Sequence, residues 1–329
     1  MATSDSSNTS GPRVSEQTFS SYNQAQGQKY VQARHDYNPL VYQAVVEHHT
    51  STGGRPDTLL DVGCGPGLAA RALAPHFAQV IGLDPSEGML AVARSLDGAS
   101  STGEPIRWER GAAEELDEVP QLAPASVDLI TAANAAHWFD MPRFWAAAAR
   151  ARRPGGTVAL WTSGDIRAHP SMPGAAKIQA AMDRHFEVNL RPHMTAGNLL
   201  TMGGYADLPL PWTKNPGDGN DEAANAVARQ FDEAKFVRRD WAADEEFFVS
   251  NSEVNLDGFE KLMATVSAQT RWNQAHPELV GTDKDVIKIL RREIEEALHE
   301  AGVEKGKEKL KGSVLGVLLI VKKRGVHDQ

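Results

Sequence analysis

The stretch that most constrains the fold is Leu59–Gly67, where a short apolar run breaks into glycines at every second position. An apolar pattern with helical spacing resumes at Leu68. A strand, a glycine turn and a helix in this order form the first half of a βαβ nucleotide-binding unit, in which bare backbone approaches a ligand at the carboxyl end of the strand. The sequence therefore predicts a nucleotide-type site at this turn.

The spacing of the glycines bears on which nucleotide binds. Gly63, Gly65 and Gly67 form the pattern G-x-G-x-G, whereas the dinucleotide fingerprint is G-x-G-x-x-G. A pyrophosphate binds at helix amides and is disfavoured by a nearby anion, yet Asp61 leads directly into this loop. The pattern counts against NAD, and the carboxylate favours a ligand that carries positive charge.

A second acidic residue follows at the end of the next predicted strand. The run Gln79–Leu83 ends in Asp84, seventeen residues past Gly67. A carboxylate at this point can accept hydrogen bonds from both hydroxyls of a ribose. The glycine loop and this acid together resemble the S-adenosylmethionine (SAM) site of class I methyltransferases, which implies SAM as the cofactor. The alternative is a turn that binds nothing, because glycine loops at strand ends are often only turns.

Strands and helices alternate through the first half of the chain. Apolar runs predict five strands, at residues 58–62, 79–84, 106–110, 127–133 and 157–161. A sixth strand is expected within 236–248, and the continuously apolar Val314–Val321 predicts a last strand inside the sheet. We therefore expect an α/β fold with a doubly wound, seven-stranded, mainly parallel sheet, Rossmann-like, with a helical cap.

Changes in composition divide the chain. Residues 1–17 are rich in Ser, Thr, Asn and Gly, and residues 163–235 are too long for a simple connection. The predicted organisation is a disordered tail at 1–17, N-terminal helices and a SAM-binding core at 18–162, an insertion or cap that shapes the substrate pocket at 163–235, strands and helices that complete the sheet and cap at 236–324, and a tail at 325–329.

The resemblance implies further cofactor contacts. Class I enzymes usually present an acidic side chain to the adenine amino group after the third strand, but here Ala112 and Ala113 hold those positions. Backbone groups of that turn, or Glu114, must then recognise the adenine. Met89, in a helix that Ser86 caps, is a further candidate. Asn134 follows the fourth strand, and its turn is expected to face the transferred methyl because ligands bind at the carboxyl ends of strands.

Three other regions resemble the fungal and bacterial trans-aconitate methyltransferase group. They are the turn His137–Asp140, the aromatic and basic set Tyr22, Tyr30, Arg34 and Tyr37, and Ser267 with Trp272. The resemblance covers roughly residues 19–324 and is strongest over 59–161. It implies SAM-dependent methylation of a carboxylate oxygen of a small acid, with fungal relatives that act on small toxins, so a role in secondary metabolism is expected.

The chemistry assigns roles to these side chains. A carboxylate is ionised near neutral pH and needs no base, so Arg34 is expected to bind it by a bidentate contact, beside His137. Trp138 and Trp272 are expected to form walls of the pocket. Tyr22 and Tyr30 are expected to be further substrate contacts. A hydroxyl, thiol or amine acceptor would instead need a general base, and His137 is the candidate. Each of these residues could instead have a structural role. The tyrosines could pack their helix against the core, His137 could stabilise its turn by hydrogen bonds, and Arg34 could lie on the surface. A binding or regulatory module without methyl transfer also remains open.

Bulk properties limit the partners. The chain has 329 residues, 41% hydrophobic composition and a net charge of −9, which counts against nucleic acid and favours a small molecule. Cys64 is the single cysteine, and no histidine spacing suggests a metal site, so no metal is expected. No apolar run approaches the ~20 residues of a membrane helix. We therefore expect a cytoplasmic protein, monomeric or homodimeric.

Overall fold

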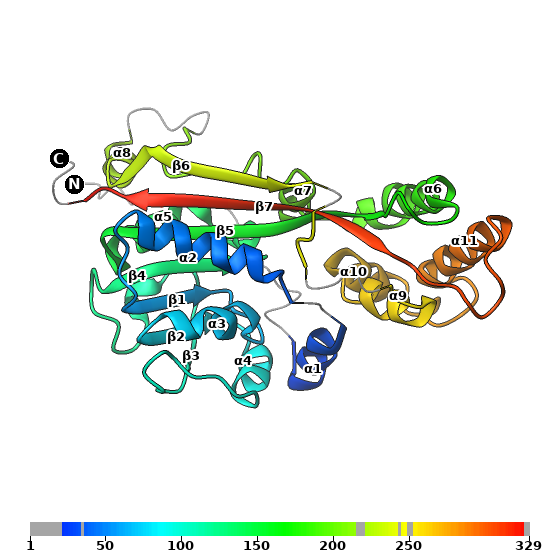
Figure 1. Ribbon diagram of the computed structural model, residues 1–329, viewed down its shortest axis with the longest axis horizontal. Coiled ribbons are helices and arrows are strands. Elements are labelled where there is room, and N and C mark those ends of the chain that lie inside the picture. Colours follow the sequence, from blue (N-terminus) through cyan, green and yellow to red (C-terminus); the bar gives the residue numbers. More distant parts are fainter. Residues whose placement is uncertain (1–21, 34–35, 215–220, 243–244, 249–252, 326–329) are drawn as a thin grey trace, which may run out of the picture.

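A seven-stranded sheet forms the centre of the molecule (Figure 1). The computed structural model describes residues 22–33, 36–214, 221–242, 245–248 and 253–325, so the predicted N-terminal tail and Arg34 lie outside the described residues. The strand order is β3-β2-β1-β4-β5-β7-β6. The strands are β1 Thr58–Val62, β2 Gln79–Asp84, β3 Arg107–Arg110, β4 Val127–Ala133, β5 Arg152–Ala168, β6 Phe231–Trp241 and β7 Gly312–Lys323.

The pairing confirms the predicted fold class. β7 runs antiparallel to its two neighbours, β5 and β6, and strands β1 to β5 pair in parallel. β7 is continuously buried from Val317 to Lys322, as expected of an apolar strand with a partner on each side. The sheet is therefore doubly wound and mainly parallel, with one reversed strand.

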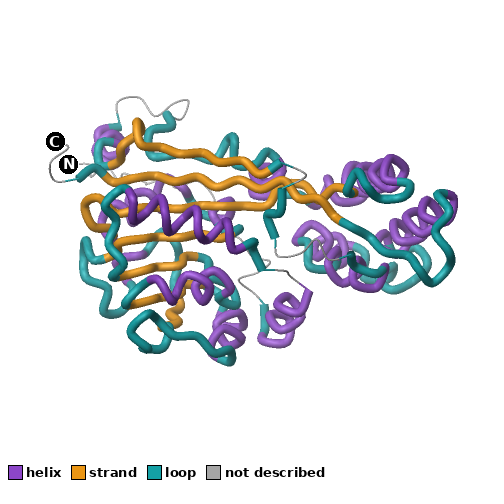
Figure 2. Tube along the Cα trace, viewed as in Figure 1, coloured by secondary structure: helices purple, strands orange, loops and turns teal. Residues whose placement is uncertain are grey.

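Helices cover both faces of the sheet (Figure 2). One apolar cluster joins the sheet to α2 and α3, and another joins the opposite face to α5. The helices are α1 Gln24–Ala33, α2 Pro39–Ser51, α3 Leu68–Leu73, α4 Glu87–Arg94, α5 Met141–Ala151, α6 Ala175–His185, α7 Ala196–Met202, α8 Glu222–Ala228, α9 Leu256–Met263, α10 Ser267–Ala275 and α11 Val286–Glu300. Short helical turns are η1 Ala74–His76, η2 Leu116–Glu118, η3 Ala136–Trp138, η4 Phe186–Leu190 and η5 Arg191–His193. Among the described residues, none of these helices has the length and apolarity needed to cross a bilayer.

Two strands differ from the expected bounds. β5 continues to Ala168, because its last residues, from Ile166 on, pair with Gly312–Val314 of β7. β6 begins at Phe231, five residues before the expected start, and ends at Trp241. The partner strand decides these lengths through backbone hydrogen bonds, which do not require the apolar residues that the sequence pattern detects.

A helical cap lies at one end of the sheet, where β5 and β7 extend beyond the other strands toward α6, α9, α10 and α11 (Figure 1). A third apolar cluster fills it, including Met182, Met263, Leu290 and Ile294. The expected single helix over 259–272 is two helices. Between them, the hydroxyl of Thr265 donates to the carbonyl of Leu262 at 2.6 Å and satisfies one carbonyl at the end of α9.

Candidate functional site

The glycine turn joins β1 to α3 and forms one wall of a cavity. Gly65 has a φ of +54°, and a Cβ there would meet nothing within 4 Å, so its backbone faces open space. Gly67 has a φ of +83°, and a Cβ there would lie 2.3 Å from the Trp108 ring. Gly63 and Gly65 therefore line the cavity, whereas Gly67 precedes α3 and packs against Trp108.

The cavity has a volume of about 420 Å³ and lies at the carboxyl ends of the strands. Ligands of doubly wound sheets bind at this edge. Of the residues predicted from the sequence to contact cofactor or substrate, the following line it: Tyr30, Gly63, Gly65, Asp84, Met89, Ala113, Glu114, Asn134 and Trp138. We refer to it as the cofactor cavity.

Asp84 lies at the end of β2 on the cavity wall. Its Oδ2 accepts a hydrogen bond from the amide of Gly65 at 2.8 Å, and its Oδ1 accepts one from the amide of Ser86, also at 2.8 Å. Each carboxylate oxygen can accept a second hydrogen bond. The two amides therefore fix the orientation of the carboxylate at the cavity wall, and a carboxylate held there suits a contact with ribose hydroxyls.

Asp61 lies outside the lining of this cavity. It is fully buried beneath the turn, and the hydroxyl of Thr131 donates to its Oδ1 at 2.7 Å. Burial raises its pKa to about 7, although hydrogen bonds from Thr131 and the backbone of Ala70 oppose that rise. The carboxyl group of Asp61 is therefore partly protonated near neutral pH. It is shielded from the cavity and supports the glycine turn from beneath. The sequence interpretation of Asp61 as a direct counter-charge for the ligand does not match this placement.

The turn after β3 closes another side of the cavity. Ala112, Ala113 and Glu114 all line it. The Oε1 of Glu114 accepts a hydrogen bond from the amide of Asp140 at 2.8 Å, which ties this turn to the start of α5. The side chain of Glu114 thus holds two walls together.

Arg71 is a support of the glycine turn that the sequence reading missed. Its guanidinium donates to the carbonyls of Pro66 and Gly67 at 2.7 and 2.8 Å and lies over the ring of Trp108, 5.1 Å from the centroid. Its position in α3, four residues after Gly67, was the available signal, because residues four apart lie on one helix face.

A second cavity, of about 120 Å³, adjoins the first, and we call it the acceptor cavity. Tyr30, Asn134 and Trp138 line both cavities. Its other walls are His137, Ser163, Gly164, Ile166, Phe186, Met194, Asn198, Thr201, Met202, Val266, Ser267 and Ala268. Asn134 has a φ of +53°, a conformation uncommon for a residue with a side chain, and its Oδ1 accepts a hydrogen bond from Thr162 at 2.6 Å.

His137 lines the acceptor cavity beside Trp138, with ring centroids 4.5 Å apart. Its Nδ1 shares a 2.9 Å hydrogen bond with the hydroxyl of Tyr205. The surrounding protein removes most of its hydration, which lowers the pKa of His137 to about 3. The ring is therefore neutral at pH 7, and Tyr205 fixes its orientation.

Tyr205 was not predicted from the sequence. It is fully buried, has a φ of +58°, and lies in the segment after α7, 68 residues from His137. Burial raises the pKa of its hydroxyl well above the usual value, so it remains protonated. Its positive φ was not visible in the sequence, and nothing in the local pattern connects it with His137.

Two predicted substrate residues lie away from both cavities. The carbonyl of Tyr22 accepts a hydrogen bond from Ser86 at 3.4 Å, beside the start of α4. Trp272 packs in the cap core against the ring of His276, with centroids 4.9 Å apart. Trp272 follows Ser267 by five residues, which turns it about 140° around the helix from the cavity side. Tyr37, also in the aromatic set, lines the cofactor cavity.

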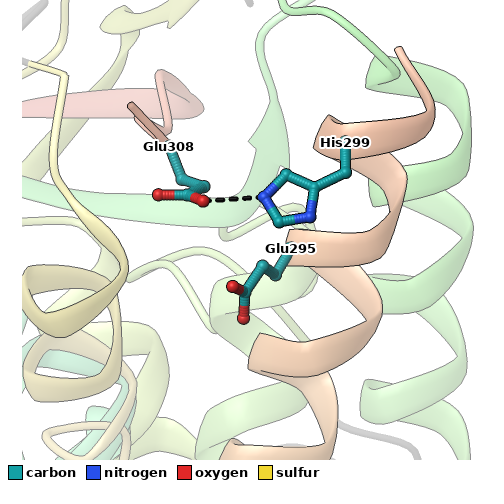
Figure 3. A group of neighbouring side chains, drawn as sticks. All are labelled: Glu295, His299 and Glu308. Atoms are coloured by element: carbon teal, nitrogen blue, oxygen red, sulfur yellow. Dashed lines mark hydrogen bonds and ion pairs between the residues drawn. The ribbon is translucent and has the colours of Figure 1, made fainter. Parts of the chain in front are cut away.

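A group of possible metal ligands occurs elsewhere, at the end of α11. Figure 3 shows Glu295 and His299 on α11, with Glu308 facing the imidazole from the following segment. Their ligand atoms lie within 4.8 Å of one another. However, the Nε2 of His299 and Oε1 of Glu308 are 2.7 Å apart, and Glu308 also accepts from the amide of Gly306 at 2.9 Å. These are hydrogen-bond distances, and they explain why His299 and Glu308 lie close together.

Comparison with known proteins identifies the domain around the cofactor cavity. Residues 60–160 match the methyltransferase domain family. The chain is 35% identical over 135 residues to a candidate methyltransferase of Dictyostelium discoideum, covering 41% of this chain and 46% of that protein. It is 28% identical over 224 residues to the methyltransferase cfoB of Aspergillus candidus, covering 68% of this chain and 63% of that protein. The aligned part thus spans about half of the first relative and under two thirds of the second.

A solved structure extends the likeness to most of the chain. A candidate type II methyltransferase from Anaeromyxobacter dehalogenans superposes with a TM-score of 0.57 at 25% identity, covering 88% of this chain and 97% of that one. The family match begins in β1 and ends in β5, and it includes the glycine turn, Asp84, Asn134 and His137. Residues 60–160 of this chain therefore match a methyltransferase domain, and most of the chain shares the fold of a methyltransferase structure.

Proposed function

We propose that the whole chain is a SAM-dependent methyltransferase that acts on a small molecule, and that the acceptor atom is a carboxylate oxygen. The observation that carries this proposal is that Tyr30, Asn134 and Trp138 line both the cofactor cavity and the acceptor cavity. Two cavities that share a wall can hold a methyl donor and an acceptor in contact, and such alignment supplies much of the catalysis in a displacement reaction.

The residues of the cofactor cavity fit SAM, which supplies a methyl group on a positively charged sulfur. The exposed backbone of Gly65 allows close approach, and Asp84 offers two acceptor oxygens for the ribose hydroxyls. Ala113 and Glu114 would lie at the adenine, with Asn134 toward the acceptor cavity. The cavity has no phosphate-binding pattern of the dinucleotide type, which counts against NAD.

The acceptor cavity offers hydrogen-bond donors suited to an anion. The Nδ2 of Asn198 donates to the hydroxyl of Ser267 at 2.9 Å, and the guanidinium of Arg271 donates to the Oδ1 of Asn198. The guanidinium of Arg271 also lies 3.5 Å from the hydroxyl of Ser267, so its positive charge contacts both groups and favours an anionic ligand beside them. We also propose that Arg34 binds the carboxylate and that residues 163–235 select the substrate.

In the proposed reaction, a carboxylate oxygen attacks the methyl carbon while the bond from carbon to sulfur breaks. The sulfur keeps that electron pair and becomes neutral, so no proton is transferred. The chain's contribution is to align the acceptor beside Asn134 and Trp138 and to exclude water. An acid of the trans-aconitate type, or an acidic secondary metabolite, fits this scheme.

The test is S-adenosylhomocysteine formation by the full chain with SAM and a panel of di- and tricarboxylic acids, phenols, thiols and amines. We expect turnover with acids only. No binding of SAM and no shift of the melting temperature at saturating SAM would rule out the enzyme. Cofactor binding without product across the panel would instead indicate a binding or regulatory module.

The second candidate is methylation of a hydroxyl, thiol or amine with His137 as base. Its position in the acceptor cavity favours it, but a pKa of about 3 makes a weak proton acceptor at pH 7. His137→Ala separates the two schemes. With a carboxylate acceptor we expect a loss of turnover of about tenfold or less, whereas loss of a general base typically costs 10²- to 10⁴-fold. Tyr205→Phe is the matched variant, because it removes the hydrogen bond and keeps the imidazole.

A further inference from the structure

A third cavity, of about 110 Å³, lies under the helical cap, and we call it the tail cavity. The distal parts of β5 and β7 form its floor, and these strands run toward α6, α9 and α11 in Figure 1. Its apolar wall consists of Ile166, Ala168, Met172, Ile178, Met182, Phe248, Val254, Phe259, Leu262, Ile294, Leu310 and Val314. Such a wall binds hydrocarbon by removing it from water.

The tail cavity adjoins the acceptor cavity. Ser163 and Ile166 line both. Between these two residues the pairing of β5 with β7 shifts register, so β5 contains one extra residue there. A bulge of this kind bends a strand and redirects its side chains, and bulges are common beside active sites. The three cavities therefore follow one another: cofactor, acceptor, tail.

The charge of the tail cavity is one-sided. Among its described lining residues the charged ones are Arg167, which is exposed, and Lys311, which is half-buried, and both are basic. The chain as a whole carries a net charge of −9, so two cations beside an apolar wall contrast with the overall balance. A guanidinium and an ammonium at this position would pair with an anionic group of a ligand.

We propose, on the basis of the function proposed above, that the acceptor is an elongated amphipathic diacid. One carboxylate lies in the acceptor cavity beside Asn134 and receives the methyl group. The hydrocarbon body passes Ser163 and Ile166 into the tail cavity, and the second carboxylate pairs with Arg167 and Lys311. The product is the monomethyl ester.

The experiment uses α,ω-dicarboxylic acids of four to twelve carbons and the monocarboxylic acids of the same lengths. Binding to the full chain without SAM is measured by calorimetry, and turnover is measured with SAM. We expect affinity to rise about fourfold for each added methylene until the cavity is full. We also expect the longer diacids to bind at least tenfold tighter than the monoacids of equal length.

Variants locate the effect. Val254→Trp and Leu262→Trp should each remove the preference for long diacids and leave butanedioate unaffected, while Val280→Trp, at a side chain that is 44% exposed, should change neither. Two Trp variants are used because one could disturb the fold, which the melting temperature reports. Arg167→Gln and Lys311→Gln should reduce the advantage of diacids over monoacids, and the exposed Lys284→Gln is their control.

The outcomes separate the two proposals. Turnover that does not depend on chain length, or a dependence that the Trp variants leave intact, would overturn the proposal that the tail cavity binds the acceptor. The proposal of a methyltransferase would still stand. Length-dependent binding of diacids without SAM binding or turnover would support the cavity and overturn the proposed function.

Discussion

At the scale of single residues, two carboxylates of the cofactor region have opposite environments. Asp84 is held by two backbone amides at the edge of the cavity, whereas Asp61 is fully buried and has a pKa near 7. Carboxylates that differ in this way take different roles. Asp84 is the one suited to contact a ligand, and Asp61 is suited to hold the turn.

Replacing Asp84 by alanine should weaken SAM binding by about 1.5–3 kcal/mol, because hydrogen bonds to a charged group are lost. The expected result is roughly a 10- to 150-fold rise in Kd, measured by calorimetry. Asp84→Asn keeps one acceptor oxygen and should lose less. An unchanged Kd in Asp84→Ala would remove this residue from the cofactor site.

At the scale of elements, α1 is held on α4 by close backbone contact. A Cβ on Gly88 would lie 2.0 Å from the carbonyl oxygen of Tyr22, and a Cβ on Gly27 would lie 3.1 Å from the carbonyl of Gly88. α1 carries Tyr30, which lines both the cofactor and the acceptor cavities. The position of this helix therefore determines how well the two cavities are closed.

Gly88→Ala should displace α1, because a methyl group 2.0 Å from a backbone oxygen requires the chain to shift. We expect Kd for SAM and KM for the acceptor to rise together by about tenfold, since misplacement by 1 Å can be this costly. The melting temperature should change little, because few α1 residues are buried. Gly203→Ala is the control, since its Cβ would make only ordinary contacts at 3.5 and 3.8 Å. Wild-type values for both constants in Gly88→Ala would mean that α1 does not close the site.

At the scale of the whole molecule, buried titratable groups couple stability to pH. Burial lowers the pKa of His49 and His185 to about 4 and of His137 to about 3, although other contacts partly oppose this at His49 and His185. Between pH 6.5 and 4 the unfolded chain binds protons at these sites and the native protein does not, so acidification favours unfolding. Asp61 acts in the opposite direction, because its native pKa of about 7 lies above the unfolded value of 3.8.

At the three histidines the unfolded chain binds about three protons more than the native protein, and at Asp61 the native protein binds about one more. The net difference between the two states is therefore roughly two protons. The free energy of unfolding should therefore fall by about 2–3 kcal/mol for each pH unit between about pH 6 and 4.5. Urea unfolding at several pH values measures this slope. His185→Gln should reduce this slope by the equivalent of about one proton, whatever it does to stability at pH 7. An unchanged slope in that variant would contradict the lowered pKa of His185.

The sequence by itself determined the features that depend on neighbours along the chain. The glycine spacing after β1, Asp84 at the end of β2, the cap of α4 at Ser86 and the apolar run of β7 all correspond to the structure, because local conformation and strand burial leave a periodic pattern. The positions of Asn134 and Trp138 followed from the rule that strand ends meet at one edge of the sheet. These features were enough for the fold class and for one wall of the site.

Only the tertiary structure decided the contacts between distant segments. The hydrogen bond of Tyr205 to His137, the burial of Asp61 and the turn of Trp272 into the cap core each depend on how elements pack, which no local pattern records. The tail cavity arises in the same way, since the length and bulge of β5 are set by its pairing with β7. A side chain's chemistry is fixed by its sequence, but its surroundings, and hence its charge state and partners, come from residues far away in the chain.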